Sequence, residues 1–285
     1  DAQLNHAVVA GAGNVAIISA QKLDANSAQL SSDQTLKLQA TETNLQTSKL
    51  QGARGVDVSA GNLDLSNANV TSGDSLSVIG NSQKGGTLSA QRSINIALKQ
   101  DLDLSSGALI AGQAVSVNAQ GINTDYAQVN ANRIELDAGN KEISNLGGRI
   151  VATGESAGSA QPALQLRGNG INNAGGIISS AGDANFDAGG NYLKNANGNI
   201  SVFGSATLNV GGVNNRGGSY VTGGSINLIG SDIDNSQGKL QSGASINLDF
   251  LDNCADYFFG IEEIIIATDG DVKGIEMRDA LILRF

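Results

Sequence analysis

Residues 213–220 read Val213-Asn214-Asn215-Arg216-Gly217-Gly218-Ser219-Tyr220, and this stretch decides the fold because it returns along the chain. Its pattern is an apolar residue, Asn two positions later, Gly three positions further, and a second apolar residue. The pattern occurs in residues 143–150, 171–178, 193–200, 213–220 and 233–240. Its Asn and Gly positions are Asn145, Asn173, Asn195, Asn215, Asn235, Gly148, Gly176, Gly198, Gly218 and Gly238. Such a repeat indicates stacked structural units.

Short alternations of apolar and polar residues recur around these corners at steps near 20 residues. They begin at Val15-Ala16-Ile17 and end at Ile246-Asn247-Leu248, with twelve in all. Alternation over so few residues predicts strands with one buried face rather than helices. We therefore predict an all-β fold, a right-handed parallel β-helix of about 12 coils of ~20 residues with three short strands per coil. At the usual strand spacing the rod would be roughly 55–60 Å long.

The recurring Asn and Gly have a physical reason at the corners of such coils. Both residues tolerate the left-handed backbone that sharp corners need. An Asn side chain can also hydrogen-bond the equivalent amide one coil away. We expect the five Asn and five Gly to form a corner ladder with a structural role, and we predict no catalytic, cofactor-binding or metal-binding residue in the chain.

Composition excludes several classes of function. The net charge is −10, aromatic residues make up 4% of the chain, and Cys254 and His6 are the single Cys and His. An acidic chain lacks the basic face that nucleic acid binding needs. One Cys cannot form an internal disulfide framework, and no apolar run is long enough to cross a bilayer. The sequence predicts no cofactor, no nucleic acid and no membrane insertion.

Two segments interrupt the repeat. Residues 151–162, with the only Pro, read as a loop extruded at one corner, and residues 80–86 read as a compressed coil without its middle apolar point. The composition changes after Leu248, so we divide the chain into a repeat domain, 1–248, and a tail, 249–285. The tail contains a hairpin pattern about Asp269-Gly270. A native cap on the last coil and a break in the reading frame both remain open for it.

The corners of residues 171–176 and 213–218, together with the Leu-Asp-Leu units, resemble the repeats of filamentous haemagglutinin-like exoproteins of two-partner secretion. They also resemble the stems of contact-dependent growth inhibition toxins. The resemblance implies an elongated rod, secreted to the surface of a Gram-negative cell by an outer-membrane transporter that engages an amino-terminal domain missing from these residues. It implies adhesion to a receptor on a host or neighbouring cell, a glycan among the candidates, or display of a terminal toxin.

The alternative is a carbohydrate-active β-helix enzyme, a polysaccharide lyase or hydrolase, with a groove beside residues 148–164. The paired carboxylates would be Asp64 with Asp103, and Asp137 with Asp187. Each pair is two coils apart, about 10 Å, which exceeds the separation in glycosidases. No cluster of Arg or Lys accompanies either pair in the sequence. We therefore expect a protein that is not an enzyme.

Overall fold

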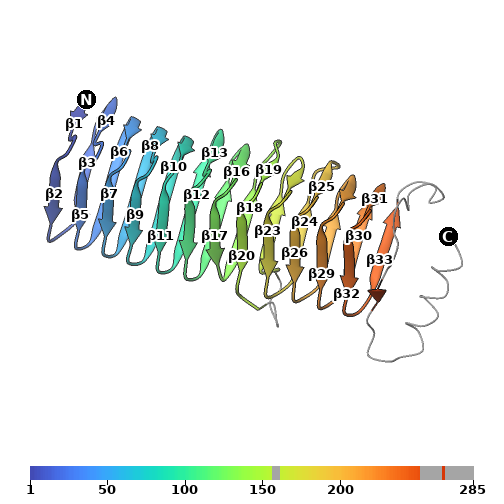
Figure 1. Cartoon of the computed structure of the whole chain (residues 1–285). Helices are drawn as coiled ribbons and strands as arrows, with labels where there is room; N and C mark the ends of the chain where they lie inside the picture. Colours follow the sequence, from blue (N-terminus) through green and yellow to red (C-terminus); the bar gives the residue numbers. More distant parts are fainter. Residues whose placement is uncertain (156–160, 251–264, 267–285) are drawn as a thin grey trace, which may run out of the picture.

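The computed structural model describes residues 1–155, 161–250 and 265–266 of the chain. These residues form a parallel β-helix whose coils stack in one row from the amino-terminal end (Figure 1). Regular structure in the described residues consists of strands alone, and strands of successive coils pair in parallel. The predicted all-β solenoid of about 12 coils is confirmed.

Each coil contributes to three faces. The first face is the 13-stranded sheet of β2 (Val8–Gly11), β5 (Gln29–Ser32), β7 (Lys49–Gly52), β9 (Asn69–Ser72), β11 (Thr87–Ala90), β14 (Ala108–Ala111), β17 (Gln128–Ala131), β20 (Arg149–Ala152), β23 (Ile177–Ser180), β26 (Asn199–Val202), β29 (Ser219–Thr222), β32 (Lys239–Ser242) and β34 (Ile265–Ile266). The second face contains β3 (Val15–Ile18), β12 (Ser93–Leu98), β15 (Ala114–Asn118), β18 (Arg133–Asp137), β21 (Leu164–Arg167), β24 (Ala184–Asp187), β27 (Ala206–Asn209), β30 (Ile226–Gly230) and β33 (Ile246–Phe250). The third face contains β1 (Ala2–Gln3), β4 (Lys22–Asp24), β13 (Asp101–Asp103), β16 (Gly121–Asn123), β19 (Ile143–Ser144), β22 (Ile171–Asn172), β25 (Tyr192–Lys194), β28 (Gly212–Asn214) and β31 (Asp232–Asp234).

Three coils differ from the predicted three short strands. In them the strands of the second and third faces are continuous, as β6 (Thr35–Asn44), β8 (Gly55–Asp64) and β10 (Ser75–Lys84). Their bends superimpose residue on residue, with Ala60 paired to both Ala40 and Gly80. Pairing resumes in register directly after the bend residues Thr41, Gly61 and Asn81, so these three strands belong to both faces and join them into one 21-stranded sheet.

Most of the interior consists of columns of apolar side chains, with one side chain from each coil. In one column, Leu36, Val56, Leu76 and Ile94 lie in register and are all fully buried. The alternate residues of the same strands point outward and are mostly polar. Burying a side chain of this size contributes about 1.5–3 kcal/mol relative to leaving it exposed. The alternation in the sequence thus becomes a continuous core along the rod.

The described parts of the two irregular segments retain the coil register. Leu164 pairs with Ile134 directly after the insertion, so the extra residues leave the ladder unchanged. Gln83 occupies the interior position that Leu63 and Leu102 occupy in the coils on either side, which explains the missing apolar point.

The regular pairing continues past residue 248. Phe250 pairs with Gly230, and the short strand β34 pairs in parallel with β32. The predicted tail hairpin lies outside the described residues, as does most of the segment 249–285.

Two aromatic rings interrupt the aliphatic columns. Phe186 and Tyr220 meet edge to face with ring centroids 6.3 Å apart. Tyr220 is 1% exposed, and its hydroxyl has no hydrogen-bond partner among the described residues. Burial raises the pKa of Tyr220 above its ordinary value. Its hydroxyl therefore loses hydration without an equivalent bond inside the rod.

We expect Tyr220→Phe to raise the free energy of unfolding by about 1–2 kcal/mol, because only the unpaired hydroxyl is removed. Guanidinium denaturation followed by circular dichroism measures this change. Above about pH 10 the unfolded tyrosine ionises while the buried one stays protonated, so the wild type loses stability there and the variant loses less. The control is Tyr192→Phe, which removes a surface hydrogen bond to Asp232 and should give no gain. A less stable Tyr220→Phe would contradict the prediction.

Candidate functional site

The five Asn of the repeated corner stack inside the rod. The Nδ2 group of each Asn donates to Oδ1 of the next, from Asn145 through Asn173, Asn195 and Asn215 to Asn235, at 2.6–2.7 Å. All five side chains are at most 2% exposed. A buried amide is stable only when its donors and acceptors are paired, and the ladder provides this pairing.

The backbone at this corner differs from the expectation in one respect. The left-handed residues lie two positions after the Asn, as in Gly147 (φ 58°), Gly175 (φ 63°) and Asn197 (φ 55°). The ladder Asn residues themselves lack a positive φ. The Gly three positions after each Asn is needed because a side chain there would clash. A Cβ on Gly176 would lie 2.6 Å from Asn173 Oδ1 and against the backbone oxygen of Asn145.

The start of this ladder was not predicted from the sequence. Thr124 holds the ladder position one coil before Asn145, and its hydroxyl donates to Asn145 Oδ1 at 3.1 Å. In earlier coils the same corner is apolar, with Leu45, Leu65 and Leu104 buried there. The sequence contained a signal for this equivalence, because each of these Leu residues lies two positions before the left-handed residue of its corner, as each ladder Asn does.

The outer surface of the third face carries a second set of contacts. Each of them joins side chains two coils apart, and in one the Tyr192 hydroxyl donates to Asp232 at 2.7 Å across Gly212 of the intervening coil. The hydrogen bond and the charge of Asp232 raise the pKa of Tyr192, together with partial burial. The other two contacts join Lys141 to Asp101 at 2.9 Å and Lys194 to Glu142 at 2.8 Å. These contacts have a structural role, because each links two coils at the surface of the rod.

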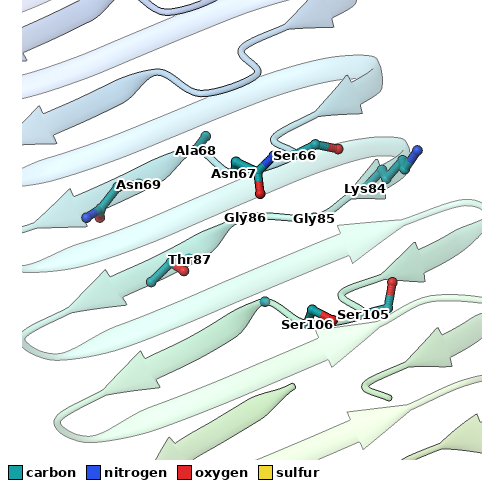
Figure 2. A pocket seen from close by; sticks show the side chains of 11 residues that line it. Ser66, Asn67, Ala68, Asn69, Lys84, Gly85, Gly86, Thr87, Ser105 and Ser106 are labelled. Carbon is teal, nitrogen blue, oxygen red and sulfur yellow. The ribbon is translucent and has the colours of Figure 1, made fainter. Parts of the chain in front are cut away.

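The compressed coil creates a hollow on the corner that leads from the third face to the first. Four residues separate Asp64 from Asn69, and only two, Gly85 and Gly86, separate the paired residues Lys84 and Thr87 in the next coil. The hollow, which we call the notch, has a volume of about 480 Å³. Its floor is Gly85–Gly86, between Ser66–Asn67 on one side and Ser105–Ser106 on the other (Figure 2).

The side chains around the notch are polar and open to binding. Asn67, Thr87, Ser105 and Ser106 make no side-chain hydrogen bond within the described residues, and all four are exposed. Two coils earlier, at the same corner, the hydroxyls of Ser27 and Thr47 bond each other at 2.7 Å. The notch has no such bond because its middle coil contributes only Gly85 and Gly86 at this corner, and neither carries a side-chain hydroxyl.

The carboxylate pairs considered for an enzyme are each interrupted by a cation. Arg167 lies in register between Asp137 and Asp187 and contacts them at 3.6 and 3.7 Å. Lys84 lies in register between Asp64 and Asp103. These cations were not predicted from the sequence, because each comes from the intervening coil. The Arg167 guanidinium occupies the space that a glycosidic bond between two catalytic carboxylates would need.

The coils described above match a known repeat. A family model described as the haemagglutinin repeat matches residues 2–80, 79–156, 128–192 and 204–249. The chain belongs to the haemagglutinin-repeat family. As a filamentous haemagglutinin-like protein, it is of a type that forms secreted or surface-located adhesin rods. No curated protein and no solved structure matches the chain.

The described residues of this haemagglutinin-repeat rod show no metal-binding cluster and no membrane-spanning helix. Within residues 1–155, 161–250 and 265–266, no three His, Cys, Asp or Glu side chains are grouped so that they could hold a metal ion. The described part of the chain contains no helix long and apolar enough to span a membrane. His6 is an exposed corner residue with φ 60°. The Gly11–Gly13 segment leads from the end of β2 toward β3 and is part of a corner.

Asp64, at the edge of the notch, gives the haemagglutinin-repeat rod a testable acid sensitivity. Burial alone would raise its pKa, but hydrogen bonds from Ser66 and Gln46 and the charge of Lys84 hold the pKa below its ordinary value. A lowered pKa in the folded state stabilises the fold above the ordinary value of 3.8, and this contribution is lost as the pH falls through the folded pKa. We expect the melting temperature of the wild type to drop below about pH 4, and that of Asp64→Asn to drop less. Asp57→Asn, an exposed carboxylate on the same strand, is the control and should retain the wild-type slope.

Proposed function

We propose that the chain is the rod of a bacterial surface adhesin, exported through an outer-membrane transporter of two-partner secretion and displayed on a Gram-negative cell. There it binds a receptor on a host or neighbouring cell, or holds a terminal toxin away from the membrane. The observation that carries the proposal is the uninterrupted stack of coils whose residues match the haemagglutinin repeat almost throughout.

Two physical features support export as an unfolded chain. Each coil contacts mainly its neighbours, so the rod can fold coil by coil as residues emerge from a transporter. A single Cys, Cys254, leaves no internal disulfide that could close a loop before passage.

The test joins the chain to the secretion domain of a two-partner system and expresses it with and without the cognate transporter. We expect transporter-dependent exposure of a carboxy-terminal epitope to external protease, and increased adherence of the cells to epithelial and bacterial monolayers. The control is the secretion domain alone. An epitope that stays protected despite an active transporter would contradict the proposed export.

The proposal includes the absence of catalysis. Arg167 between Asp137 and Asp187 supports it, because the ion contacts fix both carboxylates as a structural triad. The purified chain should release no reducing ends or unsaturated products from pectin, alginate or peptidoglycan. Turnover that disappears in both Asp137→Asn and Asp187→Asn would overturn this part.

A further inference from the structure

We propose that the notch and the ring of Tyr126 together form a binding site for a short, neutral, linear oligosaccharide lying along the rod axis. The proposal rests on the proposed adhesin function and assigns it one place on the rod. Two separate observations lead to it, the unpaired polar walls of the notch and an exposed aromatic residue on the same corner.

The notch has the chemistry of a sugar site. Its walls present hydroxyl and amide groups, in Asn67, Ser105 and Ser106, that both donate and accept hydrogen bonds and have no partner in the described chain. Its floor is the glycine backbone of Gly85 and Gly86, and no apolar side chain larger than Ala lines it. A peptide would need an apolar pocket or an open strand edge, which the notch lacks. Hydroxyl groups of a sugar match it.

Tyr126 provides the apolar counterpart. It occupies the left-handed position of its corner (φ 55°), one coil after Ser106, and it is 74% exposed. His6, Thr47 and Gln237 hold the same conformation at this corner, so what distinguishes Tyr126 is its exposed ring. A Cβ on Gly147 would lie 2.8 Å from the Tyr126 ring, so the ring extends to this glycine in the next coil and most of its surface is open to solvent. An open ring face suits the C–H face of a sugar.

The spacing and the charge define the ligand further. The backbone of Tyr126 is two coils from the notch floor and its ring reaches Gly147 one coil further, about 10–14 Å along the rod, so a ligand that reaches both must be a chain rather than a single sugar. Lys84 lies in register between Asp64 and Asp103, so its charge is offset locally. An acidic glycan would meet no net positive surface, and the neutral class is favoured.

The test applies the full 285-residue chain to a printed array of neutral hexose and N-acetylhexosamine oligosaccharides, with sialylated and sulfated glycans alongside. The first variant replaces Gly85-Gly86 with the four-residue corner sequence of Leu65–Ala68, which fills the notch with a corner that the neighbouring coil already uses. The second is Tyr126→Asn, which retains a residue suited to the left-handed backbone. The control is Phe203→Ala, an equally exposed ring on another corner.

We expect the wild type and Phe203→Ala to bind neutral oligosaccharides alike, with about tenfold or greater loss in Tyr126→Asn and complete loss in the filled-notch variant. Circular dichroism melts confirm that both variants fold. Failure to bind any neutral glycan, binding confined to acidic glycans, or full binding by the filled-notch variant would each overturn the proposal. Adherence of displayed cells that is the same with the filled notch would also overturn it, while leaving the rod's proposed adhesin function standing.

Discussion

Asn195→Ala should lower the free energy of unfolding by about 3 kcal/mol. The side chain accepts from Asn173 and donates to Asn215, both at 2.7 Å, and it is 1% exposed. Removing it leaves a buried donor on one neighbour and a buried acceptor on the other, each costing about 1–3 kcal/mol. Both groups belong to coils that cannot close over the gap, because their spacing is fixed by the backbone hydrogen bonds of the sheets.

Native-state hydrogen exchange at the amides of β26 and β29 is the suitable measurement, because a stack of coils need not unfold as one unit. The matched control is Asn199→Ala, an exposed Asn four residues further along, which should change stability by less than about 0.5 kcal/mol. Equal effects of the two substitutions would show that the ladder contributes nothing beyond helping the corner to turn.

Gly176→Ala should destabilise the rod by about 3 kcal/mol, because the added methyl group meets atoms that cannot move away. It would press on the backbone oxygen of Asn145 and lie 2.6 Å from Asn173 Oδ1, and both are held by the ladder and the sheets. The rod would have to separate two coils or break an amide contact to admit it.

The adjacent residue provides the control within the same corner. Gly175 has φ 63° and open space around its Cβ position, so Gly175→Ala has only the cost of the left-handed conformation, about 1–2 kcal/mol. Thermal melts of the two variants should therefore differ clearly. If Gly175→Ala proved the more damaging, backbone conformation rather than packing would control the corner.

Much of the fold could be predicted because period and alternation are properties of the sequence. Apolar residues such as Leu76 and Val78 alternate with polar ones, and the alternation itself determines which side chains face inward. The step near 20 residues then determines that equivalent residues meet in successive coils. The equivalence of the five Asn follows from the repeated Asn–Gly pattern, although Asn145 and Asn173 are 28 residues apart.

The candidate sites could be predicted less well, because they depend on which residues of neighbouring coils are placed side by side. Arg167 lies 30 positions after Asp137 with an insertion between them, and only the register brings them together. The notch results from a corner that is two residues shorter than its neighbours. It forms a hollow only because the corners of the coils before and after it are longer.

The sequence by itself determined the period, the strand character and the inward face of this protein, since these depend on local spacing and on the hydrophobic effect. The tertiary structure alone decided which glycine of each Gly-Gly corner turns the backbone and which makes room for an amide. Both glycines are equally permissive as isolated residues. Their roles differ because the preceding coil places the backbone oxygen of Asn145 against Gly176, whereas no atom lies near the Cβ position of Gly175.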